Sequence, residues 1–302
     1  MIGLLVVTLL APSGALVRLP AAADLVAAVR SGDDVEIERI AGRLGAVRLL
    51  RLAEKGKGPE RLAALRALPL VDDGWAVLPD LSRLISDGDE EVAARAADCA
   101  RRIAEGMTPE LKERQEMPGD IPARAADELS KLAKSATLKS PLRVTAIQAL
   151  AALRGVARVD EKALGALLTD PDKEIRHAAA EALAGASAGE KPLGDALAND
   201  SAKDVAAAAA AALCRDVPLI APTGKPGSAA LQPEARAARM GAAARERLRK
   251  LALDDEVPLA DRLDLVPCLR VAKKDSDQKV LDELARRPPE AMRRRARALG
   301  GR

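Results

Sequence analysis

The apolar positions along this chain recur at the spacing of one face of an α-helix. The pattern is clearest in residues 167–183, where one helix ends, an Asp-Pro-Asp turn follows and a second helix begins. The second helix has apolar side chains at i, i+3, i+4, i+7 and i+8, which are Ile175, Ala178, Ala179, Ala182 and Leu183. Asp172 is the expected N-cap, because its carboxylate can accept a bond from a free N–H of the first turn. The segment therefore predicts a helix pair joined by a short turn.

The same frame recurs along the chain, so the sequence predicts an array of helix pairs. Helix starts are expected after Asp87 and Asp200, and at prolines 59, 141 and 258, because proline is favoured at the first helical position. Anchors at residues 60, 92, 142, 175, 205 and 259 are separated by 32, 50, 33, 30 and 54 residues. The two long intervals contain segments rich in proline and glycine, 107–120 and 216–232, which we interpret as loop insertions and candidate functional sites.

The order of turn Asp, Val or Ile followed by Arg, Ala-Ala and Ala-Leu resembles HEAT repeats, including the short bacterial HEAT-like variety. The resemblance covers roughly residues 46–299. It implies an all-α, right-handed α-α superhelix of the HEAT/armadillo type, with about seven helix pairs in a domain of residues 24–302. It also implies a ladder between repeats, to which Asp87, Asp170 and Asp200 match as acids, and Arg143 and Arg176 as bases. Ala follows Val92 and Val205, so we expect the ladder to be incomplete.

Composition favours helices. Phe and Tyr are absent and Trp75 is the only aromatic residue, whereas strands favour aromatic and β-branched side chains. Tetratricopeptide repeats are the alternative helical array, but they need aromatic residues at several positions of each repeat, and this chain has too few aromatic residues to supply them. The cysteines Cys99, Cys214 and Cys268 are far apart and form no CxxC pair, so no disulfide framework is expected. We interpret Cys99 and Cys268 as small core residues.

The first residues follow a different pattern. Residues 2–10 form a short apolar run, and three alanines at 21–23 precede Asp24. This is typical of a secretory signal, although no Lys or Arg precedes the run, and a buried N-terminal helix is the alternative. We therefore expect cleavage of residues 1–23 and export to the periplasm or the medium, with a cytoplasmic chain as the alternative. No membrane span is expected in the mature chain.

The formal net charge of +3 is unevenly spread. Residues 286–302 hold seven Arg and one Glu, a local charge of +6, so the rest of the chain carries 3 − 6 = −3. A second basic segment, 234–250, holds the candidate patch Arg236, Arg239, Arg245, Arg247, Arg249 and Lys250. Both segments could contact phosphate, but acidic residues 254–256 follow directly and aromatic stacking platforms are missing. We interpret the patch as a solvated helix face, with nucleic-acid binding as the alternative.

No catalytic, cofactor-binding or metal site is predicted. Residues 185–189 match G-x-S-x-G, but Ser187 follows a helix rather than a strand, so we expect an ordinary turn between repeats. His177 is the only histidine and has no partner constellation in the sequence. Neither CxxC, HxxxH nor an acidic loop spacing indicates a metal.

These observations favour a non-catalytic protein-interaction scaffold whose protein partner is unknown. The resemblance implies that second helices line the concave side, which makes Arg95, Arg143, Arg176 and His177 the candidate partner-binding residues. Nucleic-acid binding is the second hypothesis. A lyase-like enzyme is the third, because some bacterial HEAT-like repeats resemble phycobilin lyases, but no residue here matches a catalytic role.

Overall fold

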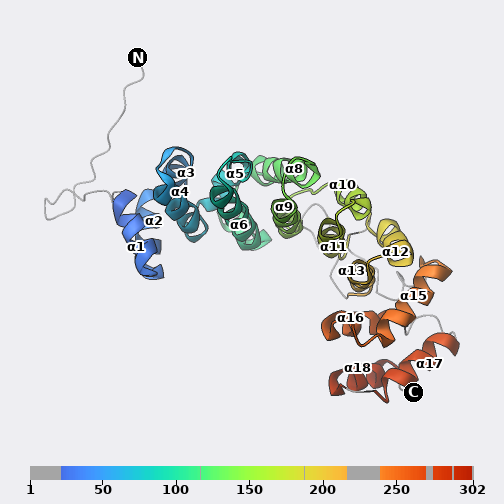
Figure 1. Cartoon of the computed structure of the whole chain (residues 1–302). Coiled ribbons are helices and arrows are strands. Elements are labelled where there is room, and N and C mark those ends of the chain that lie inside the picture. Colours follow the sequence, from blue (N-terminus) through green and yellow to red (C-terminus); the bar gives the residue numbers. More distant parts are fainter. Residues whose placement is uncertain are drawn as a thin grey trace, which may run out of the picture. The chain divides into compact units, whose positions relative to one another are not determined.

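The computed structural model describes residues 22–115, 117–186, 188–215, 239–269, 275–287 and 289–300. Helices connected by turns make up this described part, which contains no strand, and this confirms the predicted all-α class (Figure 1). Residues 1–21 of the expected signal, the insertion at 216–232, Arg236 and Ser187 lie outside the described residues. The chain divides into two compact units, Met1–Val77 and Leu78–Arg302, whereas the sequence indicated no division within residues 24–302.

The first unit is a small helical cluster. Its elements are α1 (Ala22–Ser31), α2 (Asp34–Leu44), α3 (Ala46–Lys55), α4 (Gly58–Ala67) and the 3-10 turn η1 (Leu68–Leu70). Helix α1 packs on α2 and α4, and α3 packs on α4. Gly45 joins α2 to α3 with φ at 71°, a left-handed conformation that favours glycine. The Asp73 carboxylate accepts the Ala46 N–H at 3.1 Å and so satisfies a free donor at the start of α3.

The second unit is a stack of helix pairs that follows the 3-10 segment η2 (Gly74–Asp80). Its elements are α5 (Leu81–Ile85), α6 (Glu90–Gly106), α7 (Pro109–Arg114), α8 (Asp120–Lys134), α9 (Ser140–Leu153), α10 (Glu161–Ala166), η3 (Leu167–Thr169), α11 (Lys173–Ala182), α12 (Glu190–Asn199), α13 (Lys203–Cys214), α15 (Ala242–Leu253), α16 (Leu259–Leu269), α17 (Asp275–Leu284) and α18 (Glu290–Gly300). The pairs are α5/α6, α8/α9, α10/α11, α12/α13, α15/α16 and α17/α18.

Successive pairs of the second unit contact one another mainly through their second helices. Helix α6 packs on α9, α9 on α11, α11 on α13, α13 on α16, and α16 on α18 (Figure 1). We name these helices the second-helix row. The partners α5, α8, α10, α12, α15 and α17 form the first-helix row. The second helices α9, α11, α13 and α16 therefore bury apolar surface against their own partners and against the pairs before and after them, and α6 and α18 do so on one side.

The core of the second unit consists of the predicted helical stripes. Ile175, Ala179 and Leu183 are fully buried, and Val205 and Ala209 are equally buried one pair further on. Asp172 is the N-cap of α11, as predicted, and accepts the Glu174 N–H at 2.8 Å. The spacing of apolar side chains and the capping carboxylate thus place this helix as the sequence indicated.

Helix α13 is buried on all sides. Every residue from Val205 to Cys214 is buried, and residues 206–212 are all alanine. Its neighbours in the stack are α11, α12 and α16. Small side chains let these helices approach closely, but each alanine buries little apolar surface.

A disulfide joins α13 to α16. Cys214 and Cys268 are bonded, with their Cα atoms 5.4 Å apart, although 54 residues separate them in the sequence. The expectation of no disulfide is therefore wrong, because stacking places the ends of two second helices side by side. Cys268 is buried as predicted, but as half of a cross-link. Cys99 is a free thiol buried in α6, and burial raises its pKa well above the usual range.

The insertion at 107–120 is more ordered than the predicted loop. It contains α7, whose first turn is capped by Thr108 through the Leu111 N–H at 3.1 Å. The Lys112 ammonium donates to the Val156 carbonyl at 3.0 Å, beyond the end of α9. Met107 and Met117 are buried at its two ends. The segment is thus packed against the stack, so it is a weaker candidate for a binding loop than the sequence suggested. None of the helices in the described residues has the length and apolarity needed to cross a bilayer.

Candidate functional site

Charged residues at the turns between first and second helices are the main polar feature of the second unit. Asp87, Asp170 and Asp200 each lie three residues before a second helix, and Asp254 precedes α16. Each carboxylate accepts the backbone N–H two residues further on, at 2.9, 2.9, 2.8 and 3.0 Å respectively. This local bond holds the turn closed and directs the carboxylate along the edge of the stack.

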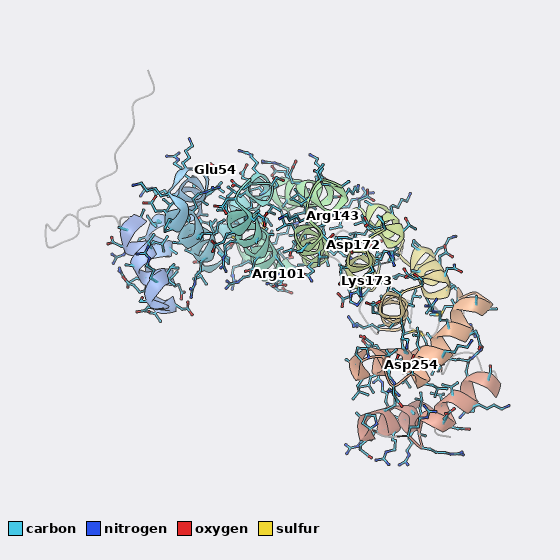
Figure 2. The ribbon with its side chains drawn as sticks, in the orientation of Figure 1. Glu54, Arg101, Arg143, Asp172, Lys173 and Asp254 are labelled. Carbon is cyan, nitrogen blue, oxygen red and sulfur yellow. A yellow bond between two sulfur atoms is a disulfide. The ribbon has the colours of Figure 1, made fainter. Side chains whose placement is uncertain are left out.

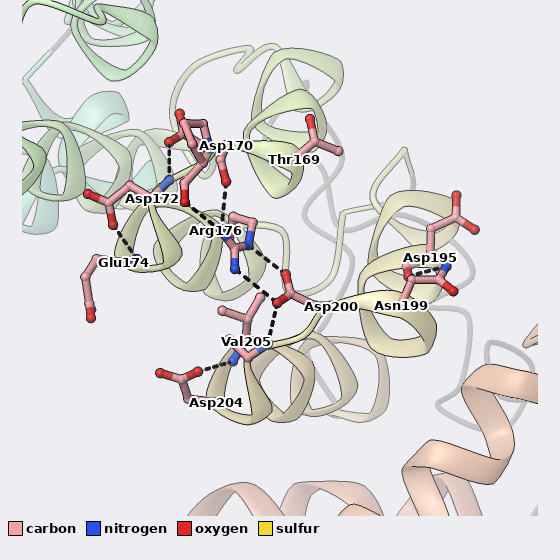
Figure 3. A network of polar contacts seen from close by, with 12 residues as sticks. Thr169, Asp170, Asp172, Glu174, Arg176, Asp195, Asn199, Asp200, Asp204 and Val205 are labelled. Carbon is pink, nitrogen blue, oxygen red and sulfur yellow. Dashed lines mark hydrogen bonds and ion pairs between the residues drawn. The ribbon is translucent and has the colours of Figure 1, made fainter.

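Arg176 and Asp200 make the most complete contact between neighbouring pairs (Figure 3). The guanidinium donates from Nε at 2.7 Å and from Nη2 at 3.1 Å to the two carboxylate oxygens. Its Nη1 donates to the Asp170 carbonyl at 2.9 Å. The hydrogen bond to Asp200 raises the pKa of Arg176. Burial raises the pKa of Asp200, but the bonds from Arg176 and from the Ala202 N–H outweigh it, so the pKa is lowered.

The Arg143–Asp170 contact is the equivalent one between α9 and the next turn. Arg143 Nη2 lies 2.5 Å from the Asp170 carboxylate, and Nε donates to the Ala133 carbonyl at 2.9 Å. The Ser140 hydroxyl donates to Asp172, which is labelled near Arg143 in Figure 2. We call each such contact between neighbouring pairs a rung. The two rungs join the residues for which the resemblance to HEAT repeats implied a ladder.

Two further rungs use residues that the sequence pattern did not indicate. Ala206 stands where α9 and α11 have their arginines, but Lys203 at the start of α13 lies 2.8 Å from Asp254. The hydrogen bonds that Lys203 donates to Asp254 and Glu256 raise the pKa of Lys203. Between α6 and α9 the charges are reversed, since Glu90 at the start of α6 pairs with Lys139 before α9. The predicted gaps in the ladder are thus filled by other charged residues.

The rungs change the set of candidate partner-binding residues. Arg143 is only 8% exposed and its guanidinium is bound within the stack, so its prediction as a surface residue is wrong. The Arg176 side chain is 14% exposed and is committed to Asp200. Arg95 on α6 is exposed. His177 is half-buried, with Nδ1 3.7 Å from the Glu181 carboxylate.

A row of polar side chains, two exposed and one half-buried, crosses three second helices away from the rungs. Asp98, Gln148 and Glu181 each stand six residues after the apolar anchor of their helix, and all three reach solvent. They lie on α6, α9 and α11, which pack in that order. We name this set the second-helix surface. Sequence reasoning missed it because it followed the cations of the repeat, whereas the repeat frame itself placed these positions on one face.

The described part of the basic segment, residues 239–250, is largely engaged within the protein. In α15, Arg249 Nε donates to the buried Asp277 carboxylate at 2.5 Å, and Arg245 lies 3.9 Å from the same group. Arg239 pairs with Glu190 at 3.1 Å and Lys250 with Glu246 at 3.6 Å. Arg247 donates to the Ala198 carbonyl at 3.4 Å. These contacts leave few unpaired cations for phosphate on this helix.

A hollow of about 550 Å³ lies beside the Arg176–Asp200 rung and is lined by α12. Its charged groups are already paired, since Lys191 lies 2.7 Å from Asp195 and Asn199 donates to the Asp195 carbonyl at 3.0 Å. Within the described residues, no three His, Cys, Asp or Glu side chains are grouped so that they could hold a metal ion. The chemistry available here is pairing of charges and hydrogen bonding.

Comparisons with known proteins give no family for this chain. No family model matches it, and no curated protein matches it. A solved crystal structure described as an engineered protein is similar over 92% of this chain and 94% of its own, at 18% identity and a TM-score of 0.30. That likeness is too weak to carry an argument about function.

Proposed function

We propose that this chain is a non-catalytic scaffold of the HEAT type, in a right-handed α-α superhelix, that binds a protein partner through the second-helix surface. One observation supports this best. The turn carboxylates of Asp170 and Asp200 are bound in rungs between pairs, while Gln148 and Glu181 are exposed and Asp98 is half-buried on consecutive packed helices. An extended row of this kind is what repeat stacks offer to a partner.

Arg95 and His177 complete the proposed surface. Arg95 is exposed on α6, and His177 lies one turn before Glu181 on α11. The row therefore mixes acidic, basic and amide groups, which suits a polar protein surface better than a uniformly charged polymer. Nucleic-acid binding through residues 234–250 and the Arg-rich C-terminus remains the alternative. The described arginines of α15 do not favour it, because Arg245 and Arg249 pair with Asp277 and Arg247 donates to the Ala198 carbonyl.

Site-specific photo-crosslinking tests the proposal. A photoreactive side chain at Gln148, on the second-helix row, is compared with one at Lys131, exposed on α8 of the first-helix row. We expect one defined adduct from Gln148 and none from Lys131, and we expect Glu181→Lys to remove the adduct. Equal adducts from both positions, or adducts from Lys131 alone, would contradict binding through the second-helix surface.

We also propose that the chain is exported. The apolar run 2–10 with the alanines at 21–23, and a buried disulfide, support an oxidising compartment. N-terminal sequencing of chain recovered from each compartment of a bacterial host tests this. A start at Asp24 outside the cytoplasm is expected, and an intact N-terminus in the cytoplasm would contradict it.

A further inference from the structure

The joint between α13 and α16 is fastened at both ends. At the start of α13, Lys203 lies 2.8 Å from Asp254, in the turn before α16. At the end of α13, Cys214 is bonded to Cys268 near the end of α16. Arg215 lies 2.9 Å from Asp264 beside the disulfide. The two helices therefore run in the same direction, with an ion pair at one end and a covalent bond at the other.

The two helices contribute different side chains between the rung and the cysteines, because α16 buries Leu265, Val266 and Leu269 against the small side chains of α13. On the α13 side the contact is made by an alanine helix, whose side chains bury little apolar area each. On the α16 side, Pro267 lies inside the helix directly before Cys268 and cannot donate a backbone hydrogen bond. The exposed ion pair at Lys203 adds little stability. The disulfide is therefore the strongest single contact in this joint.

We infer that Cys214 and Cys268 are an oxidative maturation site. Formation of this disulfide adds a covalent bond between the last helices, α15–α18, and the preceding stack, and the dithiol form holds them less firmly, through packing and polar contacts alone. The cross-link closes a chain separation of 54 residues, so it restricts the unfolded and partly open states strongly.

The reaction needs a disulfide-containing oxidant. One cysteine thiolate attacks the oxidant disulfide, which forms a mixed disulfide and releases one oxidant thiolate. The second cysteine thiolate then displaces the other oxidant sulfur and closes Cys214–Cys268. The chain loses two protons and two electrons, and the oxidant becomes a dithiol or two thiols.

Burial of the cysteines determines when the disulfide can form and which two of the three cysteines form it. Cys214 is 0% exposed and Cys268 is 4% exposed, so oxidation must come before or during the docking of α16 on α13. After docking, the same burial shields the bond from reductants. Cys99 is buried in α6, and burial raises the pKa of its thiol, so it stays protonated and does not compete.

Thiol counting and hydrogen exchange on the full chain test the inference. After purification from an oxidising compartment and denaturation, alkylation is expected to label Cys99 alone. Reduction, or Cys214→Ser with Cys268→Ser, is expected to speed amide exchange in α15–α18 by on the order of tenfold or more. Exchange in α1–α4 is expected to stay unchanged.

Cys99→Ser is the matched control and should leave the disulfide and the exchange of α15–α18 intact. Three alkylatable thiols in the protein from an oxidising compartment would overturn the inference. So would equal protection of α15–α18 in the oxidised and reduced chains, which would mean that packing alone holds the joint. Neither result bears on binding through the second-helix surface.

Discussion

Arg176 donates to both carboxylate oxygens of Asp200, from Nε at 2.7 Å and from Nη2 at 3.1 Å, and so connects α11 to the turn before α13. The two side chains are 14% and 5% exposed. At that degree of burial, removing one partner leaves the other as an unpaired buried charge, which lowers the stability of the fold. Exposed ion pairs contribute little to that stability. The rung is therefore expected to determine the stability of the stack.

Replacement of Arg176 tests this expectation. Arg176→Met should lower the free energy of unfolding of the second unit by about 3 kcal/mol, because Asp200 keeps its charge without its partner. Urea denaturation followed by far-UV circular dichroism measures the change. Lys191→Ala breaks a pair whose side chains are 87% and 62% exposed, and should cost less than about 1 kcal/mol. Equal losses in the two variants would contradict a special role for the rung.

The pH dependence of stability should also depend on Asp200. Its folded pKa is lowered, so its contribution is fully present above the unfolded value of about 3.9 and is lost as the pH falls through the folded value. Asp200→Asn should therefore reduce stability near neutral pH and flatten the fall in stability below pH about 4. Urea midpoints measured from pH 7 to 2 give the slope. Asp195→Asn, at an exposed carboxylate, is expected to keep the wild-type slope.

Arg143 and Arg262 offer a matched comparison, because both donate from Nε to a carbonyl ten residues earlier. Arg143 Nη2 reaches Asp170, which is itself 10% exposed. Arg262 pairs with Asp255, which is 73% exposed, and its buried Nη2 has no hydrogen-bond partner among the described residues. Arg143→Met should thus cost about 3 kcal/mol, and Arg262→Met less than half of that. Chemical denaturation of both variants measures the two losses in the free energy of unfolding. An equal or larger loss for Arg262→Met would contradict the argument.

Local features of the fold could be predicted from the sequence, and contacts between distant residues could not. Asp172 and the stripe from Ile175 to Leu183 act within one helix, so spacing alone located them. The disulfide depends on which helix ends meet after stacking, which spacing does not encode.

The role of Arg143 shows the same limit within the candidate site. A side chain at one position on a helix can face solvent or a neighbouring turn, and the packing of the neighbouring helix determines which of the two it faces. Lys203 replaced the expected arginine because another side chain could reach the same carboxylate from a different position.

The division of the chain at Val77 predicts that its two units unfold separately. Trp75, the only aromatic residue, lies in the first unit, so its fluorescence should follow that unit, while far-UV circular dichroism follows mainly the larger second unit. Gly45→Ala forces a side chain into φ at 71° and should cost the first unit about 1 kcal/mol. It should shift the fluorescence transition alone, and Arg176→Met should shift the circular dichroism transition alone. If both variants move both transitions together, the chain unfolds as one cooperative body, and the rungs stabilise the first unit as much as the second.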